Sequence, residues 1–165
     1  MTVQHPPPAF ALAHPAHFIA LGFGVGLVPV LPGTFGTLLA VPIWWLLATA
    51  VGPVALFGII VMLFAIGVWA CAVTGRALGA ADHGAMVWDE VVAFLLVLWI
   101  VPNVWTWQLA AFVLFRAFDM LKPAPIRHLE RRFKGGFGVM FDDLLAAGYT
   151  LLVLAVAWRV SFWLI

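Results

Sequence analysis

Charge is what this chain of 165 residues has least of. Asp, Glu, Lys and Arg together make up 9% of it, whereas 65% of its residues are hydrophobic. Soluble domains carry about 25% charged residues. So few polar side chains cannot cover a water-facing surface, which excludes a soluble domain, a disordered segment and a nucleic-acid-binding module. The composition predicts an all-α integral membrane protein with about four to six spans of roughly 20 residues.

Cysteine is nearly absent as well. Cys71 is the single Cys and lies in an apolar run, so an internal disulfide is excluded and a packing role is expected. No pair of His residues stands at ligand spacing, and together these absences argue against a zinc site.

The few charged residues are also missing from most of the chain. No Asp, Glu, Lys or Arg occurs between Met1 and Gly75. The charges form two islands, residues 76–90 and residues 116–143, and Arg159 is the one exception. Apolar runs flank both islands, so the polar chemistry is expected to lie between membrane segments.

Five hydrophobic segments are expected to form a single bundle of transmembrane or re-entrant helices within residues 18–165. Residues 1–17 are expected to form an extended arm, because three consecutive prolines favour extended backbone. Helices are favoured over strands because the runs show no alternating polarity. The segments are approximately residues 37–51, 54–74, 86–101, 104–120 and 144–163.

The basic residues predict which way the bundle faces. Six of them crowd the connection of residues 116–134, which should therefore be cytoplasmic. Counting crossings from there places residues 76–90 and the glycine-rich residues 22–36 on the same face. Every polar connection then lies on the cytoplasmic face, which suggests an interfacial site and not a pore.

Two pairs of acids stand where apolar segments begin. Asp89 and Glu90 open one segment, Asp142 and Asp143 open another, and Asp82 lies seven residues before Asp89. Such acids can simply cap helices, but capping explains one acid better than two. Carboxylate oxygens suit Mg²⁺ or Mn²⁺, so a site for one of these ions is expected.

Cations accompany these acids. Arg116 and Asp119 are three residues apart and should share a helix face, as an internal ion pair or an anion-binding pair. Lys122 and Arg127 flank a stretch stiffened by two prolines, which suits the binding of a phosphate. Plain positive-inside topology accounts for the remaining nearby bases, which are Arg131, Arg132 and Lys134.

Taken together, these motifs resemble the phosphatidylglycerophosphatase A family over nearly the whole chain after the arm. Ala93 and Ala147 depart from the expected Gly, and Thr37 stands where Ser is common. The resemblance is carried, in the family's order, by Pro32–Thr37, Val87–Glu90, Phe115–Arg127 and Gly135–Met140 followed by Asp142-Asp143.

The resemblance implies a Mg²⁺-dependent phosphomonoesterase of the bacterial cytoplasmic (inner) membrane. It would convert the membrane lipid phosphatidylglycerophosphate to phosphatidylglycerol and phosphate, at a site facing the cytoplasm. We expect catalytic roles for Asp82 and for four metal ligands, which are Asp89, Glu90, Asp142 and Asp143. The expected phosphate-binding residues are Arg116, Lys122, Arg127 and Thr34, and the expected supporting residues are Asp119, Gly33, Gly135 and Gly136.

Other interpretations stay open at this point. A metal-activated water and a covalent aspartyl-phosphate are both compatible with the acids, and His83 has no assigned role. A cation or proton transporter would need ionisable residues deep in the spans, where almost none occur. A non-catalytic scaffold binding anionic lipid would leave the paired acids unexplained. The oligomeric state, the number of metal ions and the acyl-chain preference do not follow from the sequence.

Overall fold

The computed structural model describes residues 6–124 and 133–161, and all regular elements within them are helices. The all-α membrane architecture is therefore confirmed. Of its helices, α3, α4 and α8 are long and apolar enough to cross a membrane. The five longest helices are α3 (Pro32–Ala50), α4 (Pro53–Leu78), α5 (Trp88–Ile100), α6 (Trp105–Leu121) and α8 (Gly135–Ser161).

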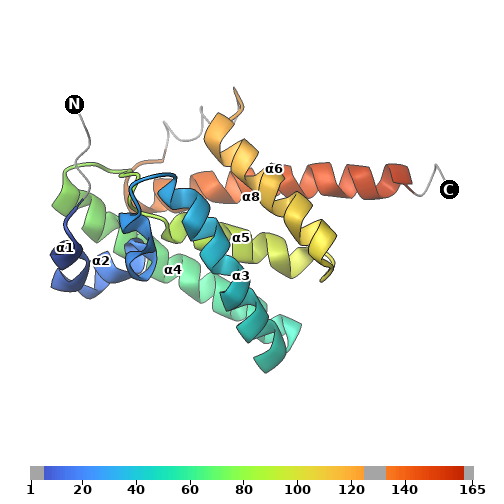
Figure 1. Ribbon diagram of the computed structural model, residues 1–165, viewed down its shortest axis with the longest axis horizontal. Helices are drawn as coiled ribbons and strands as arrows, with labels where there is room; N and C mark the ends of the chain where they lie inside the picture. The colour runs from blue at the N-terminus through green and yellow to red at the C-terminus, as the bar shows by residue number, and fades with distance from the viewer. Residues whose placement is uncertain (1–5, 125–132, 162–165) are drawn as a thin grey trace.

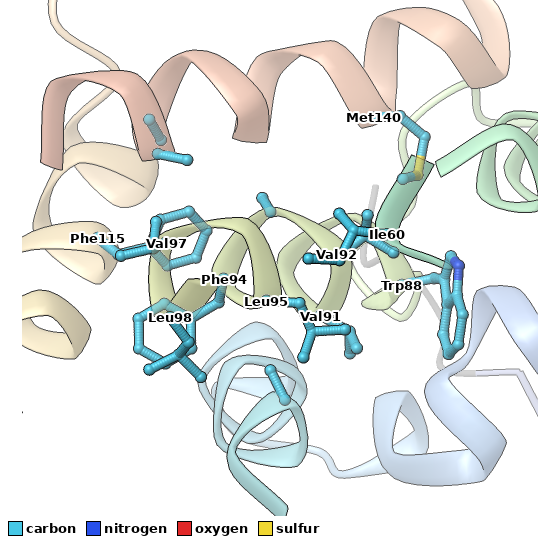
Figure 2. Close-up of a cluster of buried hydrophobic side chains, with 14 of the residues drawn as sticks. Ile60, Trp88, Val91, Val92, Phe94, Leu95, Val97, Leu98, Phe115 and Met140 are labelled. Carbon is cyan, nitrogen blue, oxygen red and sulfur yellow. The ribbon is translucent and has the colours of Figure 1, made fainter. Parts of the chain in front are cut away.

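Helix α5 is the centre of the bundle. It has 13 residues and is about 20 Å long at 1.5 Å per residue, against a hydrocarbon core of about 30 Å. Figure 2 shows its side chains packed between α8 on one side and α3 on the other. Among them Phe94, Leu95 and Leu98 are fully buried. The third expected span is thus a short helix, and α3, α4, α6 and α8 pack around it.

The helices place their polar ends together. In Figure 1 the turns that join α3 to α4 and α5 to α6 lie toward the right, as does the end of α8. The start of α5, the end of α4 and the start of α8 lie toward the left. Most of the charged residues stand in or beside these segments, whereas Arg159 lies in the last turn of α8. The fold therefore gathers polar connections that are distant in sequence at one end of the bundle.

The N-terminal residues correct the expectation of an extended arm. Helices α1 (Pro8–Ala13) and α2 (Pro15–Ala20) each begin with a proline, which suits the first helical turn because that turn needs no N–H donor there. His17 stacks on Phe10 at 4.2 Å between ring centroids, and its Nδ1 lies 3.0 Å from Thr74 Oγ1 of α4. Burial, and next the nearby His14, lower the pKa of His17, so this segment is anchored by a neutral imidazole.

Two helices begin earlier than expected. Helix α3 starts at Pro32, and α8 starts at Gly135 where a glycine-rich loop is expected from the sequence. The glycines of α8 serve close packing: a Cβ on Gly136 would lie 2.0 Å from the carbonyl oxygen of Val68 in α4. Asp142 and Asp143 are consequently inside α8, about two turns from its start, and not at its first residue.

Candidate metal and phosphate site

A polar cavity of about 180 Å³ lies at the charged end of the bundle. It is formed by the loop before α5, the start of α5, the end of α6 and the first half of α8. Both sequence islands therefore contribute to one cavity. Its lining residues are Asp82, Gly84, Met86, Asp89, Glu90, Asp119, Lys122, Val139, Asp142 and Asp143.

Three of these carboxylates converge closely. One oxygen each from Asp89, Glu90 and Asp143 lies within 4.8 Å of the other two. Asp89 and Glu90 occupy the first turn of α5, and Asp143 comes from α8. Oxygens on opposite sides of a bound Mg²⁺ are about 4 Å apart, so a small side-chain movement would bring these three onto one ion.

Each of these three carboxylates has a buried oxygen without a hydrogen-bond partner in the part of the chain that the structure describes. Asp89 Oδ1, Glu90 Oε2 and Asp143 Oδ2 are buried without a hydrogen-bond partner there. Asp89 is 7% exposed and Asp143 is 4% exposed. A buried charged oxygen without a partner costs several kcal/mol, so three in one place indicate a site for a cation. The donor set, all carboxylate oxygens, fits the hard ion Mg²⁺.

Arg116 lies behind the cavity and not in its lining. Its guanidinium contacts Asp119 three residues later, as the spacing predicts, and its Nη1 is 3.6 Å from Glu90 Oε1. The Arg116 side chain is 12% exposed, and it links α6 to the first turn of α5. Its direct effect in this structure is to fix the Glu90 carboxylate, with Asp119 supporting it.

Lys122 is the lysine that enters the cavity lining. Its Nζ lies 3.7 Å from Asp142 Oδ2 and 4.0 Å from Asp82 Oδ2. The residue ends α6 in the left-handed backbone conformation, with φ 40° and ψ 69°, and Pro123 prevents the helix from continuing. This turn directs the lysine back to the acids.

Gly33 explains part of the Pro32–Thr37 motif. A Cβ on Gly33 would lie 2.0 Å from Glu90 Oε1, and one on Gly36 would lie 2.7 Å from the Cβ of Val87. The two glycines lie on the same face of α3, three residues apart. They let α3 approach the start of α5, and the carboxylate of Glu90 occupies the space that a side chain at Gly33 would fill.

The glycines of α8 place the second pair of acids. Gly136 packs on the α4 backbone, and a Cβ on Gly67 of α4 would in turn lie 2.6 Å from the sulfur of Met140. Gly135 has a φ of 75°, which favours glycine. Asp143 lies seven residues after Gly136, so this close seam fixes the helix face that carries it.

Some predicted residues lie elsewhere. Thr34 is half-buried in the first turn of α3 and is not in the cavity lining, and Arg127 falls outside the described residues. His83 is buried, and its Nδ1 accepts the N–H of Ala85 at 3.1 Å, which gives it a structural role in the loop. Sequence reasoning missed the apolar wall made by Met86 and Val139, although Val139 precedes Asp143 by one helical turn.

The fold and this cavity define a class of protein: a helical membrane protein with a buried carboxylate cluster suited to a divalent cation. Residues 18–158 match the phosphatidylglycerophosphatase A family, and the chain belongs to that family of enzymes. No solved structure matches the chain significantly.

Curated relatives agree with the family. The chain is 39% identical over 166 residues to phosphatidylglycerophosphatase A of Haemophilus influenzae, covering 100% of both chains. It is 44% identical over 137 residues to phosphatidylglycerophosphatase A of Escherichia coli, covering 82% of this chain and 78% of that one. A protein of Bacteroides thetaiotaomicron, provisionally named a phosphatidylinositol-3-phosphatase, is 41% identical over 146 residues, covering 84% of this chain and 91% of the relative.

Proposed function

We propose that this protein hydrolyses the phosphomonoester of phosphatidylglycerophosphate to phosphatidylglycerol and inorganic phosphate, in a Mg²⁺-dependent reaction. The family and the names of two relatives support the substrate. The observation that carries the chemistry is the convergence of Asp89, Glu90 and Asp143 with unpartnered buried oxygens.

Asp89, Glu90 and Asp143 would hold the Mg²⁺, which supplies positive charge against the phosphoryl oxygens and promotes attack by water. Arg116 keeps Glu90 in place through its contact of 3.6 Å. Lys122 binds the phosphoryl oxygens, because its ammonium lies in the cavity lining and can offset the charge that develops during transfer. Among the ion-paired acids in the described residues, Asp82 is the most exposed, with 53% of its side chain accessible, so it stands where substrate enters.

The reaction consumes one water for each phosphate released. A water oxygen forms a bond to phosphorus while the bond from phosphorus to the lipid's terminal glycerol oxygen breaks. That glycerol oxygen takes up a proton and leaves as the hydroxyl of phosphatidylglycerol. A carboxylate of the cavity is the group available to accept the water's proton, and Asp82 or Asp142 is placed for this role because each lies within 4.0 Å of the ammonium of Lys122, which binds the phosphate.

We place the site at the cytoplasmic face of the bacterial inner membrane. Polar connections gather at one end of the bundle (Figure 1), and bases crowd the region between Arg116 and Lys134, which favours the cytoplasmic side. The headgroup of a membrane lipid lies at the same level as a site at the end of a bundle. Its acyl chains can then stay in the bilayer while the phosphate enters the cavity.

The structure gives less support to the two alternatives. In the described parts of α3, α4 and α8, the charged residues are Arg76, Asp142, Asp143 and Arg159, so no series of ionisable groups leads through the bundle as a transporter would need. A non-catalytic lipid-binding scaffold would have no use for three converging carboxylates with buried, unpartnered oxygens.

The test is release of phosphate from phosphatidylglycerophosphate by the purified protein in detergent, with Mg²⁺ and with excess chelator. We expect release that depends on Mg²⁺, and loss of at least about 100-fold in Asp143→Asn and Glu90→Gln. Lys134→Gln, outside the cavity lining, is the control. Full activity with chelator, or in both site variants, would refute the metal assignment.

A second substrate tests which of the two activities named for the relatives this protein has. Phosphatidylinositol 3-phosphate is offered to the same protein at the same concentration in mixed micelles. We expect phosphatidylglycerophosphate to be hydrolysed faster. Faster hydrolysis of the inositol lipid would transfer the proposal to that substrate and leave the site chemistry as argued.

A further inference from the structure

The acids of the cavity divide into two groups with different partners. Asp89, Glu90 and Asp143 each bring one carboxylate oxygen within 4.8 Å of the other two. Asp82 and Asp142 instead share the ammonium of Lys122, at 4.0 Å and 3.7 Å from Nζ. Within the described residues, the first group is flanked by Arg116 at Glu90, whereas the second group holds the Lys122 ammonium between its two carboxylates.

The two groups lie side by side in one cavity. Asp142 and Asp143 are consecutive residues of α8, and both groups line the same space of about 180 Å³. Phosphatases with two metal ions hold them about 3.5–4 Å apart between shared carboxylates, where they clamp the transferred phosphoryl group. Here a lysine ammonium lies among the second set of carboxylates.

The backbone indicates that this lysine is retained for its side chain. Lys122 ends α6 with φ 40°, a conformation in which a residue with a Cβ is strained and glycine is preferred. Its N–H donates to Phe118 O at 2.9 Å, as a glycine would at the same position. A lysine at the end of α6 is therefore less favourable for the backbone than a glycine would be, but it places an ammonium between α8 and the loop before α5.

We propose that the site takes a single divalent ion, held by Asp89, Glu90 and Asp143, and that the Lys122 ammonium is its second cation. Lys122 would bind the phosphoryl oxygens beside the ion, and Asp82 and Asp142 would hold its ammonium there. The inference rests on the proposed function and adds two points to it. The site holds one metal ion, and Lys122 takes the place of a second ion.

Manganese binding tests this without relying on turnover. Mn²⁺ is titrated into the purified full-length protein in detergent and followed by electron paramagnetic resonance. We expect one Mn²⁺ per chain with the spectrum of an isolated ion. In Lys122→Met, which keeps the length and removes the charge, we expect a second Mn²⁺ to enter beside Asp82 and Asp142 and the two spins to couple.

Two matched variants complete the experiment. Lys122→Arg retains a cation and should keep one uncoupled Mn²⁺. Asp142→Asn should also keep one, because that carboxylate holds the lysine and not the ion, whereas Asp143→Asn should weaken Mn²⁺ binding at least tenfold. The wild-type titration decides the question even if Lys122→Met does not fold.

The outcomes separate this inference from the proposed function. Two coupled Mn²⁺ ions in a wild-type protein that releases phosphate would overturn the lysine's role and leave the proposed function standing. The lysine's role would equally be overturned if Lys122→Met bound one ion as the wild type does. A wild-type protein that binds no Mn²⁺ and releases no phosphate would overturn both.

Discussion

At the scale of the residue, the strain at Lys122 can be measured apart from its charge. Lys122→Gly and Lys122→Ala both remove the ammonium and differ only in the Cβ. Because φ at this position is 40°, the glycine variant should be more stable by about 1 kcal/mol. Thermal unfolding of the two variants in the same detergent measures the difference. Equal midpoints would show that the backbone relaxes when the lysine is lost.

Gly33 offers a second residue-scale test, because it determines where Glu90 can lie. An added Cβ would lie 2.0 Å from Glu90 Oε1, so Gly33→Ala should displace the carboxylate and lower phosphatase activity on the order of 100-fold. Gly58→Ala in α4 is the matched control, since a Cβ there meets nothing within 4 Å. An active Gly33→Ala variant would mean that Glu90 can take another position and still serve the site.

At the scale of the element, the seam between α4 and α8 controls where the second acidic pair lies. Gly136→Ala would place a Cβ 2.0 Å from Val68 O and 2.6 Å from Ala72 N. Neither backbone atom can move without shifting the helix, so the variant should lose about 1–3 kcal/mol of stability. Gly148→Ala in the same helix, with open space around its Cβ, should keep its unfolding temperature. Equal unfolding temperatures of the two variants would show that α4 and α8 can move apart at Gly136 with little loss of stability.

The elements also show how far sequence reasoning reaches. Helix α6 follows its expected bounds within one residue, and α4 begins within one residue of its expected start but ends four residues later, at Leu78. Long apolar runs without helix breakers are predicted well from their hydrophobicity alone. The start of α8 does not match its expected position, since glycines interpreted as a loop become helical where a neighbouring backbone approaches. Tertiary packing of this kind overrides local propensity and leaves no local signal.

The candidate site was predictable to a similar degree. Paired acids at the starts of apolar runs predicted Asp89, Glu90, Asp142 and Asp143, and the fold brings the first two together with Asp143. The contact of Arg116 with Asp119 followed from helical spacing. What the sequence could not show is that Arg116 contacts the lining residues Glu90 and Asp119 without lining the cavity itself, while Lys122 lines it. This depends on how α6 ends and on which residues it meets.

At the scale of the whole molecule, the polar ends of the helices lie at one end of the bundle (Figure 1). One experiment can therefore determine which side of the membrane that end faces. Ala81 is exposed in the loop before α5, near the cavity, and Asn103 is exposed in the turn between α5 and α6. The native Cys71 is fully buried and should not react. Cysteines introduced at Ala81 and at Asn103 therefore report on the two ends of the bundle, with the wild-type protein as the blank.

A membrane-impermeant maleimide applied to bacterial spheroplasts that express each variant measures this topology. We expect Asn103→Cys to react in intact spheroplasts and Ala81→Cys to react only after permeabilisation, because the basic end should face the cytoplasm. The opposite pattern would place the site outside. Helix α5, at 13 residues, is shorter than the roughly 20 residues of a full span. Reaction of both variants only after permeabilisation would thus identify the α5–α6 hairpin as re-entrant, with the cavity still on the cytoplasmic side.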